Sequence, residues 1–413
     1  MSRAALQSLS MLTWEQARQS IADQFARFSA QRDTETLHLS DALGRVLAQE
    51  LVSDRDYPPF DRAIRDGYAV RAADALPGSQ LPCVGEIKAG DPASAGLAPN
   101  TCIQIMTGAS VPPGADAVVM LEYTSRSGDT IFFERFTGAG QHIVRRGSES
   151  AADRKLLAPG ARLGFAELAL AAQIGASEIH AYRKPSVAIL PTGDELVPVD
   201  AAPAPHQIRN SNAVSLAAQV HLAGGEAALL GVALDDKDDL RAKIERGLQH
   251  DLLLLSGGVS MGKYDLVEAA LRDLGAEFFF DAVSVRPGKP TVFGRCQETF
   301  FLGLPGNPIS TMVTFELFAS LAIAILGGVA NPALPLASAT LADAVHEKPG
   351  MTHFLPARLD SSSGKPLVRS LPWQGSGDVV SVAKSNCFLV VPSDREKIPA
   401  GELVTILLRK DVL

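Results

Sequence analysis

The chain has 413 residues, of which 46% are hydrophobic and 20% are charged, and its net charge is −8. This length exceeds what one hydrophobic core usually organises, so we expect roughly two to four domains of a soluble globular protein. The acidic balance argues against a protein that coats nucleic acid or an acidic membrane. An anionic ligand would therefore need a local cluster of cations and backbone N–H groups.

The cysteines and the apolar segments indicate the cellular environment. Cys83, Cys102, Cys296 and Cys387 are spaced singly, without the Cys-x-x-Cys pair typical of zinc or redox-dithiol sites. Reduced thiols are the simpler interpretation. No apolar signal core follows the N-terminus, and the longest apolar run, residues 315–329, contains Glu316 and is too short for a membrane span. We predict a soluble, cytoplasmic protein without a membrane partner.

The first 184 residues are predicted to be helical, with a β-rich insertion. Residues 13–50 are expected to form two helical stretches, with Ser40-Asp41 as a candidate cap before residues 42–48. Between Leu51 and Gln141, short β-like segments alternate with Gly/Pro turns and predict a small all-β module, at residues 80–84, 102–106, 117–121 and 130–133. Residues 145–184 are predicted to return to helix, most clearly at 165–174.

From Pro185 the pattern predicts a parallel α/β sheet. Short apolar runs suited to buried strands occur at residues 187–190, 227–232, 252–255 and 300–304. Segments with helical periodicity lie between or after them, at residues 213–222, 240–249, 266–274 and 309–326. Beyond Asn331-Pro332 the chain becomes β-like again, ending in residues 388–391 and 403–408.

These patterns predict a multi-domain α/β protein. A helical N-terminal domain is expected from residues 1–53 and 142–184, with a small β module of residues 54–141 inserted into it. An α/β domain is expected at 185–331 and a C-terminal β domain at 332–413.

Two glycine-rich loops follow predicted strands of the α/β domain. One contains Ser256, Gly257, Gly258 and Ser260, and the other is Pro305-Gly306-Asn307-Pro308. Ligands of open α/β sheets bind beyond the carboxyl ends of the strands, where glycines allow close approach and helix N-termini attract anions. Asn307 before Pro308 is also typical of a helix start. Such loops can serve only as tight turns, but two in one domain favour an anion site.

Acidic side chains also follow the predicted strands and loops of this α/β domain. Asp194 and Glu195 follow the first predicted strand, and Asp265 follows the first glycine loop. Together with Asp235 they suit a site for Mg²⁺ and phosphate. For Asp235 and Asp236, capping of the following helix is an equally weighted alternative.

A basic turn follows another predicted strand. Arg286-Pro287-Gly288-Lys289-Pro290 cannot become helical, so its two cations are presented together and could bind an oxyanion. Two further segments, residues 58–69 and 105–109, contain residues typical of turns, and by themselves they indicate no chemical function.

Taken together, these segments resemble the molybdopterin molybdenumtransferase family, to which the C-terminal enzyme domain of gephyrin also belongs. The resemblance covers nearly the whole chain. Six segments occur in the family order: Pro59-Phe60-Asp61 with Asp66-Gly67-Tyr68-Ala69, Ile105-Met106-Thr107-Gly108, Thr192-Gly193-Asp194-Glu195-Leu196, residues 256–262 with Asp265, residues 286–290, and residues 303–308.

The resemblance implies insertion of molybdate into adenylated molybdopterin with release of AMP, by a homodimer whose α/β domain binds the pterin. It implies that Glu195, Asp235 and Asp265 bind Mg²⁺ and the adenylated pterin. The cations Arg286 and Lys289, with the hydroxyls of Ser310 and Ser376, would line the phosphate and molybdate region. Asp66 and Thr107 would complete the active site of the other subunit. A molybdopterin adenylyltransferase is a further partner that it implies.

The chain departs from the family pattern at a few positions. Ala282 and Met351 stand where the family often has cations, and Ser148-Glu149 replaces a Glu-Asp pair. Two alternatives stay open. One is an enzyme that adenylates molybdopterin, which usually consists of the α/β domain alone. The other is a scaffold that keeps the fold without catalysis, which the two missing cations would favour and the retained Glu195, Asp265 and Lys289 would oppose.

Overall fold

The computed structural model describes residues 11–28, 32–92, 96–135, 137–258, 266–362 and 364–412. The chain divides into two compact units. The smaller unit comprises Gln49–Ala158 and Phe165–Glu178, and the larger comprises Met1–Ala48, Pro159–Gly164 and Ile179–Leu413.

The smaller unit is built on a six-stranded sheet in the order β7-β4-β6-β5-β9-β8. These strands are β4 (Gly67–Val70), β5 (Gln80–Ile87), β6 (Cys102–Ile105), β7 (Ala117–Met120), β8 (Thr124–Ser127) and β9 (Thr130–Phe133). The all-β module is therefore present as predicted. The remaining elements are β2 (Leu51–Val52), β3 (Arg62–Ala63), β10 (Ile143–Val144), β11 (Lys155–Leu157) and helix α2 (Phe165–Gln173).

The first predicted helix is present, and the second is not. Helix α1 (Trp14–Arg27) begins with a capping box, in which Thr13 and Gln16 exchange side-chain and backbone hydrogen bonds. Residues 42–48 form no helix after the short 3₁₀ turn Leu39–Asp41. Instead, the backbone N–H groups of Gly44 and Leu47 donate to residues 163 and 161, so β-like pairing replaces the intrahelical bonds. Gly44 also has φ +75°, which interrupts a helix.

The prediction of helix over residues 145–184 is correct only for its clearest part. Helix α2 covers residues 165–173, whereas the flanking residues include strands β11 and β12 (Glu178–Tyr182). Strand β12 pairs with β1 (Thr34–His38). Its alternating burial is the period-two pattern of a strand.

The larger unit contains the α/β sheet, in the order β16-β13-β17-β21-β20-β18. Strands β13 (Ser186–Pro191), β16 (Glu226–Leu229), β17 (Leu252–Ser256) and β21 (Thr299–Leu304) are parallel, as predicted. Two antiparallel strands, β20 (Val292–Cys296) and β18 (Glu277–Phe280), extend one edge and make the sheet mixed.

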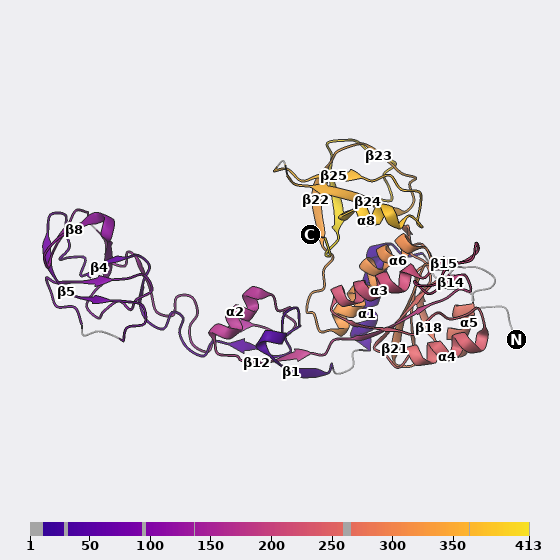
Figure 1. The fold of residues 1–413 in the computed structure, drawn as a ribbon, viewed down its shortest axis with the longest axis horizontal. Helices are drawn as coiled ribbons and strands as arrows, with labels where there is room; N and C mark the ends of the chain where they lie inside the picture. The colour runs from indigo at the N-terminus through magenta and orange to yellow at the C-terminus, as the bar shows by residue number, and fades with distance from the viewer. Residues whose placement is uncertain are drawn as a thin grey trace. The chain divides into compact units, whose positions relative to one another are not determined.

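Helices cover both faces of this sheet, because successive strand residues point to opposite sides. Val187, Ile189 and Leu254 share one core with helices α1, α3 (Ser211–Ala223), α6 (Pro308–Thr314) and α7 (Ser320–Leu326). Ala188 and Leu253 share the other core with α4 (Lys237–Gly247) and α5 (Leu266–Asp273), which lie together in Figure 1. A π-helical turn (Phe315–Ala319) joins α6 to α7.

The continuous helix Pro308–Leu326 is, within the described residues, the one helix long and apolar enough to cross a membrane. Its mean hydropathy is 2.0, but 67% of it is buried inside the protein. Because Ile309, Val313 and Phe318 belong to the core of the α/β domain, the apolar composition is that of a core helix.

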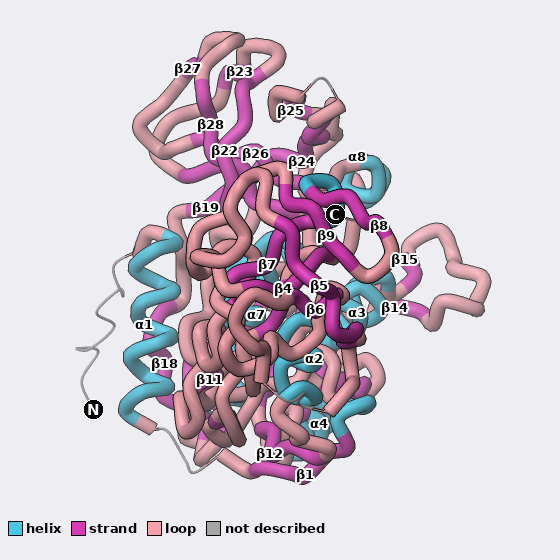
Figure 2. Tube along the Cα trace, turned by 90° about the vertical axis from the view of Figure 1, so that its left-hand side faces the viewer, coloured by secondary structure: helices cyan, strands magenta, loops and turns pink. Residues whose placement is uncertain are grey.

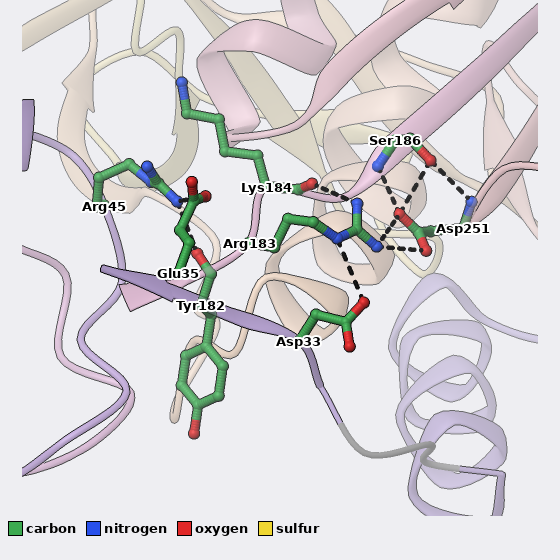
Figure 3. A network of polar contacts seen from close by, with 8 residues as sticks. All are labelled: Asp33, Glu35, Arg45, Tyr182, Arg183, Lys184, Ser186 and Asp251. Atoms are coloured by element: carbon green, nitrogen blue, oxygen red, sulfur yellow. Dashed lines mark hydrogen bonds and ion pairs between the residues drawn. The ribbon is translucent and has the colours of Figure 1, made fainter. Parts of the chain in front are cut away.

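The amino ends of the sheet are held by a polar network (Figure 3). Asp251, directly before β17, accepts two hydrogen bonds of 3.1 Å from Arg183. The same carboxylate accepts from the backbone N–H and the hydroxyl of Ser186, at 2.6 and 3.0 Å. Arg183 also lies 3.5 Å from Asp33. The network therefore joins the starts of β13 and β17 to the segment that precedes β1.

The C-terminal residues form a closed barrel. Strands β24 (Thr352–Asp360), β25 (Leu367–Ser370), β22 (Leu336–Leu341), β28 (Leu403–Leu408) and β26 (Cys387–Val391) follow one another, and a β24–β26 pairing closes the ring (Figure 2). Strand β19 (Val285–Arg286) of the preceding segment pairs with β24. Short strands β23 (Val345–His346) and β27 (Lys397–Ile398), helix α8 (Val379–Lys384), and the parallel pair β14 (Leu196–Val197) and β15 (Ile208–Arg209) complete the larger unit.

The fold class is thus a multi-domain α/β protein with β-rich parts before and after the α/β sheet. The four-part division at residues 54, 142, 185 and 332 stays a prediction.

Candidate functional site

A cleft of about 890 Å³ opens at the carboxyl ends of the parallel strands. The loops after β13, β17 and β21 contribute to its walls, as expected for an open α/β sheet. Eight residues predicted from the sequence line this cleft: Glu195, Asp235, Ser256, Gly257, Gly258, Pro305, Gly306 and Asn307. Residues distant in the sequence are therefore brought together.

The loop after β13 places Glu195 over a glycine. Gly193 has φ +136°, and a Cβ atom there would collide with the Glu195 carboxylate. The glycine therefore lets the carboxylate fold back over the loop. The backbone N–H of Gly193 donates to Ala233 at 3.2 Å, which ties this loop to the residues after β16.

The two neighbouring aspartates after β16 have separate roles. Asp236 is the N-cap of α4, where its Oδ1 accepts from the N–H groups of Asp238 and Asp239 at 3.1 and 2.9 Å. Asp235 lines the cleft instead. Burial, and then the negative charges of Asp194 and Glu195, raise the pKa of Asp235. The carboxylates are thus crowded in a way that a bound cation would relieve.

The glycine loops after β17 and β21 approach each other closely. Gly257 and Gly258 have φ +92° and +62°, and a Cβ on Gly257 would lie 2.8 Å from the carbonyl oxygen of Thr192. A Cβ on Gly258 would lie 2.6 Å from Val267. A Cβ on Gly306 would lie 3.4 Å from the Gly257 Cα atom. These loops need glycine both for their conformation and for their spacing.

Asn307 begins α6 with Pro308 at its first position, as predicted, but its side chain makes no capping hydrogen bond. The Thr311 N–H and hydroxyl donate to the Asn307 carbonyl instead, at 2.9 and 3.0 Å.

Sequence reasoning missed Asn212, which joins the two loops. Its Nδ2 donates to Ser256 Oγ at 2.9 Å, to the Gly306 carbonyl at 2.7 Å and to Thr311 Oγ1 at 3.2 Å. Its Oδ1 and the Thr192 hydroxyl are buried without a hydrogen-bond partner, although both residues line the cleft. Buried polar atoms usually have partners, so these two suit a ligand. The signal available in the sequence was Arg209-Asn210-Ser211-Asn212 before a helix.

The basic turn lies against α6, but its two cations are not among the residues that line the cleft. Arg286 and Lys289 are exposed, whereas the adjacent Pro290 lines the cleft. A Cβ on Gly288 would collide with the Thr314 methyl group, so the turn packs closely on this helix. Among the described residues, Arg209 is the one cation that lines the cleft itself.

Ser310 and Ser376 lie at the same helix. Ser310 is buried in α6, and its carbonyl accepts from the Thr314 hydroxyl at 2.7 Å. The Ser376 carbonyl accepts from the Ile309 N–H at 2.9 Å, which joins the C-terminal domain to the start of α6. The turn of residues 286–290 and the Ser376 loop thus both contact this helix.

Asp66 and Thr107 are partners in the smaller unit. Asp66 Oδ1 accepts from the backbone N–H of Thr107 at 2.6 Å and from its hydroxyl at 2.7 Å. These two hydrogen bonds lower the pKa of Asp66, so this exposed carboxylate is stabilised in its ionised form.

Ser260 and Asp265 lie outside the described residues. Within the described part of the chain, no three Asp, Glu, His or Cys side chains are grouped closely enough to hold a metal ion. Mg²⁺ needs no such group, because it usually takes one or two carboxylates together with substrate phosphates and water. Glu195 and Asp235 in the cleft fit that requirement.

The chain matches three protein families along its length. Residues 12–175 match the family described as MoeA N-terminal region (domain I and II), and residues 188–324 match the probable molybdopterin binding domain. Residues 338–408 match the MoeA C-terminal region (domain IV).

Similar proteins cover nearly the same length. The chain is 35% identical over 403 residues to the molybdopterin molybdenumtransferase of Haemophilus influenzae, covering 96% of this chain and 98% of the relative. It is 34% identical over 394 residues to that of Bacillus subtilis, covering 93% and 92%. The crystal structure of the molybdopterin biosynthesis MoeA protein of Pyrococcus horikoshii superposes with a TM-score of 0.82 at 29% identity, over 97% of this chain and all of that one.

Proposed function

The chain belongs to the molybdopterin molybdenumtransferase family, and on that premise we propose that it inserts molybdate into adenylated molybdopterin with release of AMP. The observation that carries the proposal is the cleft at the carboxyl ends of the sheet. It combines glycine loops, an aspartate crowded by neighbouring carboxylates, and buried acceptors without partners, all within the segment that matches a molybdopterin binding domain.

The adenylated pterin binds in this cleft. The backbone at Gly257, Gly258 and Gly306 approaches the phosphates, because no side chain intervenes and the positive end of the α6 helix dipole lies at this region. The Asn212 Oδ1 and the Thr192 hydroxyl provide acceptors for N–H groups of the ligand. Together with Ser256 and Ser260, these loops orient the phosphate link for cleavage.

Mg²⁺ is the cofactor that Glu195 and Asp235 fit, with Asp265 as a further ligand. When bound, it neutralises the phosphates and makes AMP a better leaving group. The chain itself holds the two carboxylates so close that their negative charges repel each other when no cation is bound. Gly193 keeps the Glu195 carboxylate in that position.

Molybdate binds beside α6, between the cations Arg286 and Lys289 and the hydroxyls of Ser310 and Ser376. A turn fixed against Thr314 presents the cations, so they need no reorganisation to contact an oxyanion. Held there, molybdate exchanges oxygen ligands, which take up protons and leave as water, for the two dithiolene sulfurs, while hydrolysis of the adenylate drives the step.

The active site is completed by a second copy of the chain. Asp66 and Thr107 form a polar pair in the smaller unit, and we propose that this pair acts in the site of the partner subunit of a homodimer. The ionised Asp66 carboxylate positions groups of the substrate. In the catalytic centre, the positive charge of Lys289 balances this negative charge.

We place this activity in the cytoplasm, where a molybdopterin adenylyltransferase supplies the adenylated pterin. The chain matches its relatives beyond the α/β domain, which favours insertion over adenylation. A scaffold without catalysis would not need the Glu195 and Asp235 pair.

The test is release of AMP from adenylated molybdopterin, measured with Mg²⁺ in the presence and absence of molybdate. We expect molybdate-dependent release that stops when Mg²⁺ is chelated. Glu195→Gln should lose most of it, whereas Asp200→Asn, on the loop between β14 and β15, should not. Tight pterin binding without AMP release would refute the proposal and favour the scaffold.

A further inference from the structure

Two of the four cysteines, spaced singly in the sequence, become neighbours in the fold. Cys83 lies in β5 and Cys102 in β6, and the two residues are direct partners in the register of these parallel strands. Both belong to the same hydrophobic cluster, so both side chains lie on one face of the sheet. The other two, Cys296 and Cys387, are buried in different clusters of the larger unit.

The strand register is compatible with a disulfide between the two cysteines. Neighbouring strands lie about 4.8 Å apart, which is within the Cα–Cα range of about 4.4–6.8 Å seen in disulfides. The Cys83 thiol is close enough to Cys102 to contribute to the raised pKa of that thiol. A register shift between Cys83 and Glu86 lets β5 adjust locally.

The two thiols differ in access, which sets an order of reaction. Cys102 is fully buried, and burial raises the pKa of its thiol to about 12. Cys83 is half-buried and reaches the surface. An external reagent therefore meets Cys83 first, and Cys102 reacts only with a sulfur already held beside it.

We propose that Cys83 and Cys102 form a thiol–disulfide exchange site that takes low-molecular-weight disulfides of the glutathione type. The Cys83 thiolate attacks the reagent disulfide and releases one small thiol, which leaves a mixed disulfide on Cys83. Cys102 then attacks the Cys83 sulfur, and its proton passes to the departing small thiolate, which leaves as the second small thiol. In total, two protein thiols and one small disulfide become one protein disulfide and two small thiols.

The disulfide would join β5 to β6 at the start of β6. That strand ends at Ile105, two residues before Thr107, the partner of Asp66. Oxidation therefore restrains the strand that leads to this polar pair. The exchange site stands independently of the proposed function.

The test treats the full chain with oxidised glutathione, traps free thiols by alkylation, and maps peptides by mass spectrometry. We expect a Cys83–Cys102 link that dithiothreitol reverses, with Cys296 and Cys387 left alkylatable. Hydrogen exchange should slow in β5 and β6 after oxidation. A stable glutathione adduct on Cys83 in the wild-type chain would overturn the proposal, as would no reaction of either thiol.

Single variants separate the two steps. Cys102→Ala, with Cys102→Ser as a second variant in case one is poorly folded, should retain a glutathione adduct on Cys83, because the second thiol is missing. Cys83→Ser should leave Cys102 unmodified. Modification of Cys102 in the Cys83→Ser chain, at the rate of the wild type, would contradict the order of reaction.

Discussion

The two ends of the α/β sheet contrast in how their charges are satisfied. At the amino ends, Asp251 is paired with Arg183 and accepts two further hydrogen bonds from Ser186. At the carboxyl ends, the negative charges of Asp235 and Glu195 repel each other. Burial and this like charge raise the pKa of Asp235. In the same cleft, Asn212 and Thr192 have buried oxygens without hydrogen-bond partners.

The amino ends of the sheet thus contribute to stability, whereas the carboxyl ends serve function. A carboxylate that is paired with a cation and hydrogen-bonded stabilises the fold, whereas crowded carboxylates cost free energy until a ligand binds. Proteins tolerate such local cost mainly at functional sites. Substitutions at the two ends should therefore have opposite consequences.

The largest effect is expected on activity at the carboxyl ends. Asp235→Asn should lower molybdate-dependent AMP release by about 10²-fold, because a charged ligand of the proposed Mg²⁺ is lost. Its unfolding midpoint in urea should equal or exceed that of the wild type, since the like-charge crowding is relieved. Asp236→Asn is the matched control, because asparagine caps a helix equally well and the activity should stay. Equal losses in both variants would contradict this assignment.

A smaller loss is expected from the glycine loop. Gly257→Ala places a methyl group 2.8 Å from the Thr192 carbonyl at φ +92°, so the loop must shift and AMP release should fall about tenfold. Gly275→Ala is the control: it has a similar φ of +83°, but no atom lies within 4 Å of the added carbon. Both variants should lose about 1–2 kcal/mol of stability from the left-handed backbone. Only the first should lose activity, as steady-state kinetics on the folded fraction would reveal.

The contrast also explains how far the sequence could predict this structure. The α/β domain follows from local patterns, because three apolar runs buried on both faces leave little choice of element. The fourth run forms the edge strand β16, which is only partly buried. The helix predicted for residues 42–48, 145–164 and 178–182 is wrong, because these residues make β-like pairings with partners far away in the sequence, such as Leu163 for Gly44. Local periodicity carries no information on such partners.

The sequence predicts those parts of the candidate site in which glycines and acidic residues directly follow strands. It predicts the other parts less well. The sequence left Asp235 and Asp236 undecided, and only the start of α4 assigns the cap to Asp236. Asn212 was missed because its importance lies in joining Ser256 to Gly306, a contact between three separate segments. The register of β5 and β6 likewise brings together two cysteines whose spacing has no recognisable motif.

At the amino ends the expected effect is on stability. Asp251→Asn should lower the free energy of unfolding by about 1–2 kcal/mol at neutral pH, since it removes the charge that Arg183 and Ser186 bind. The loss of stability is modest because the Arg183 side chain is 44% exposed, so water screens its charge. Asp343→Asn is the control, because its pair with Arg369 is exposed on both sides and should contribute little. AMP release per folded molecule should stay unchanged in both variants.

The smallest effect is the pH dependence of that stability difference. Burial raises the pKa of Asp251, but hydrogen bonds from Arg183 and Ser186 outweigh it, so the pKa lies below its usual value. A lowered folded-state pKa contributes stability that is fully present above the unfolded pKa of about 3.9 and is lost as pH falls through the folded pKa. The difference between wild type and Asp251→Asn should therefore stay constant from about pH 7 to pH 5 and shrink only below about pH 4. Urea unfolding at stepped pH measures it, and a difference that shrinks above pH 5 would mean that burial dominates and that this end of the sheet is no better satisfied than the cleft.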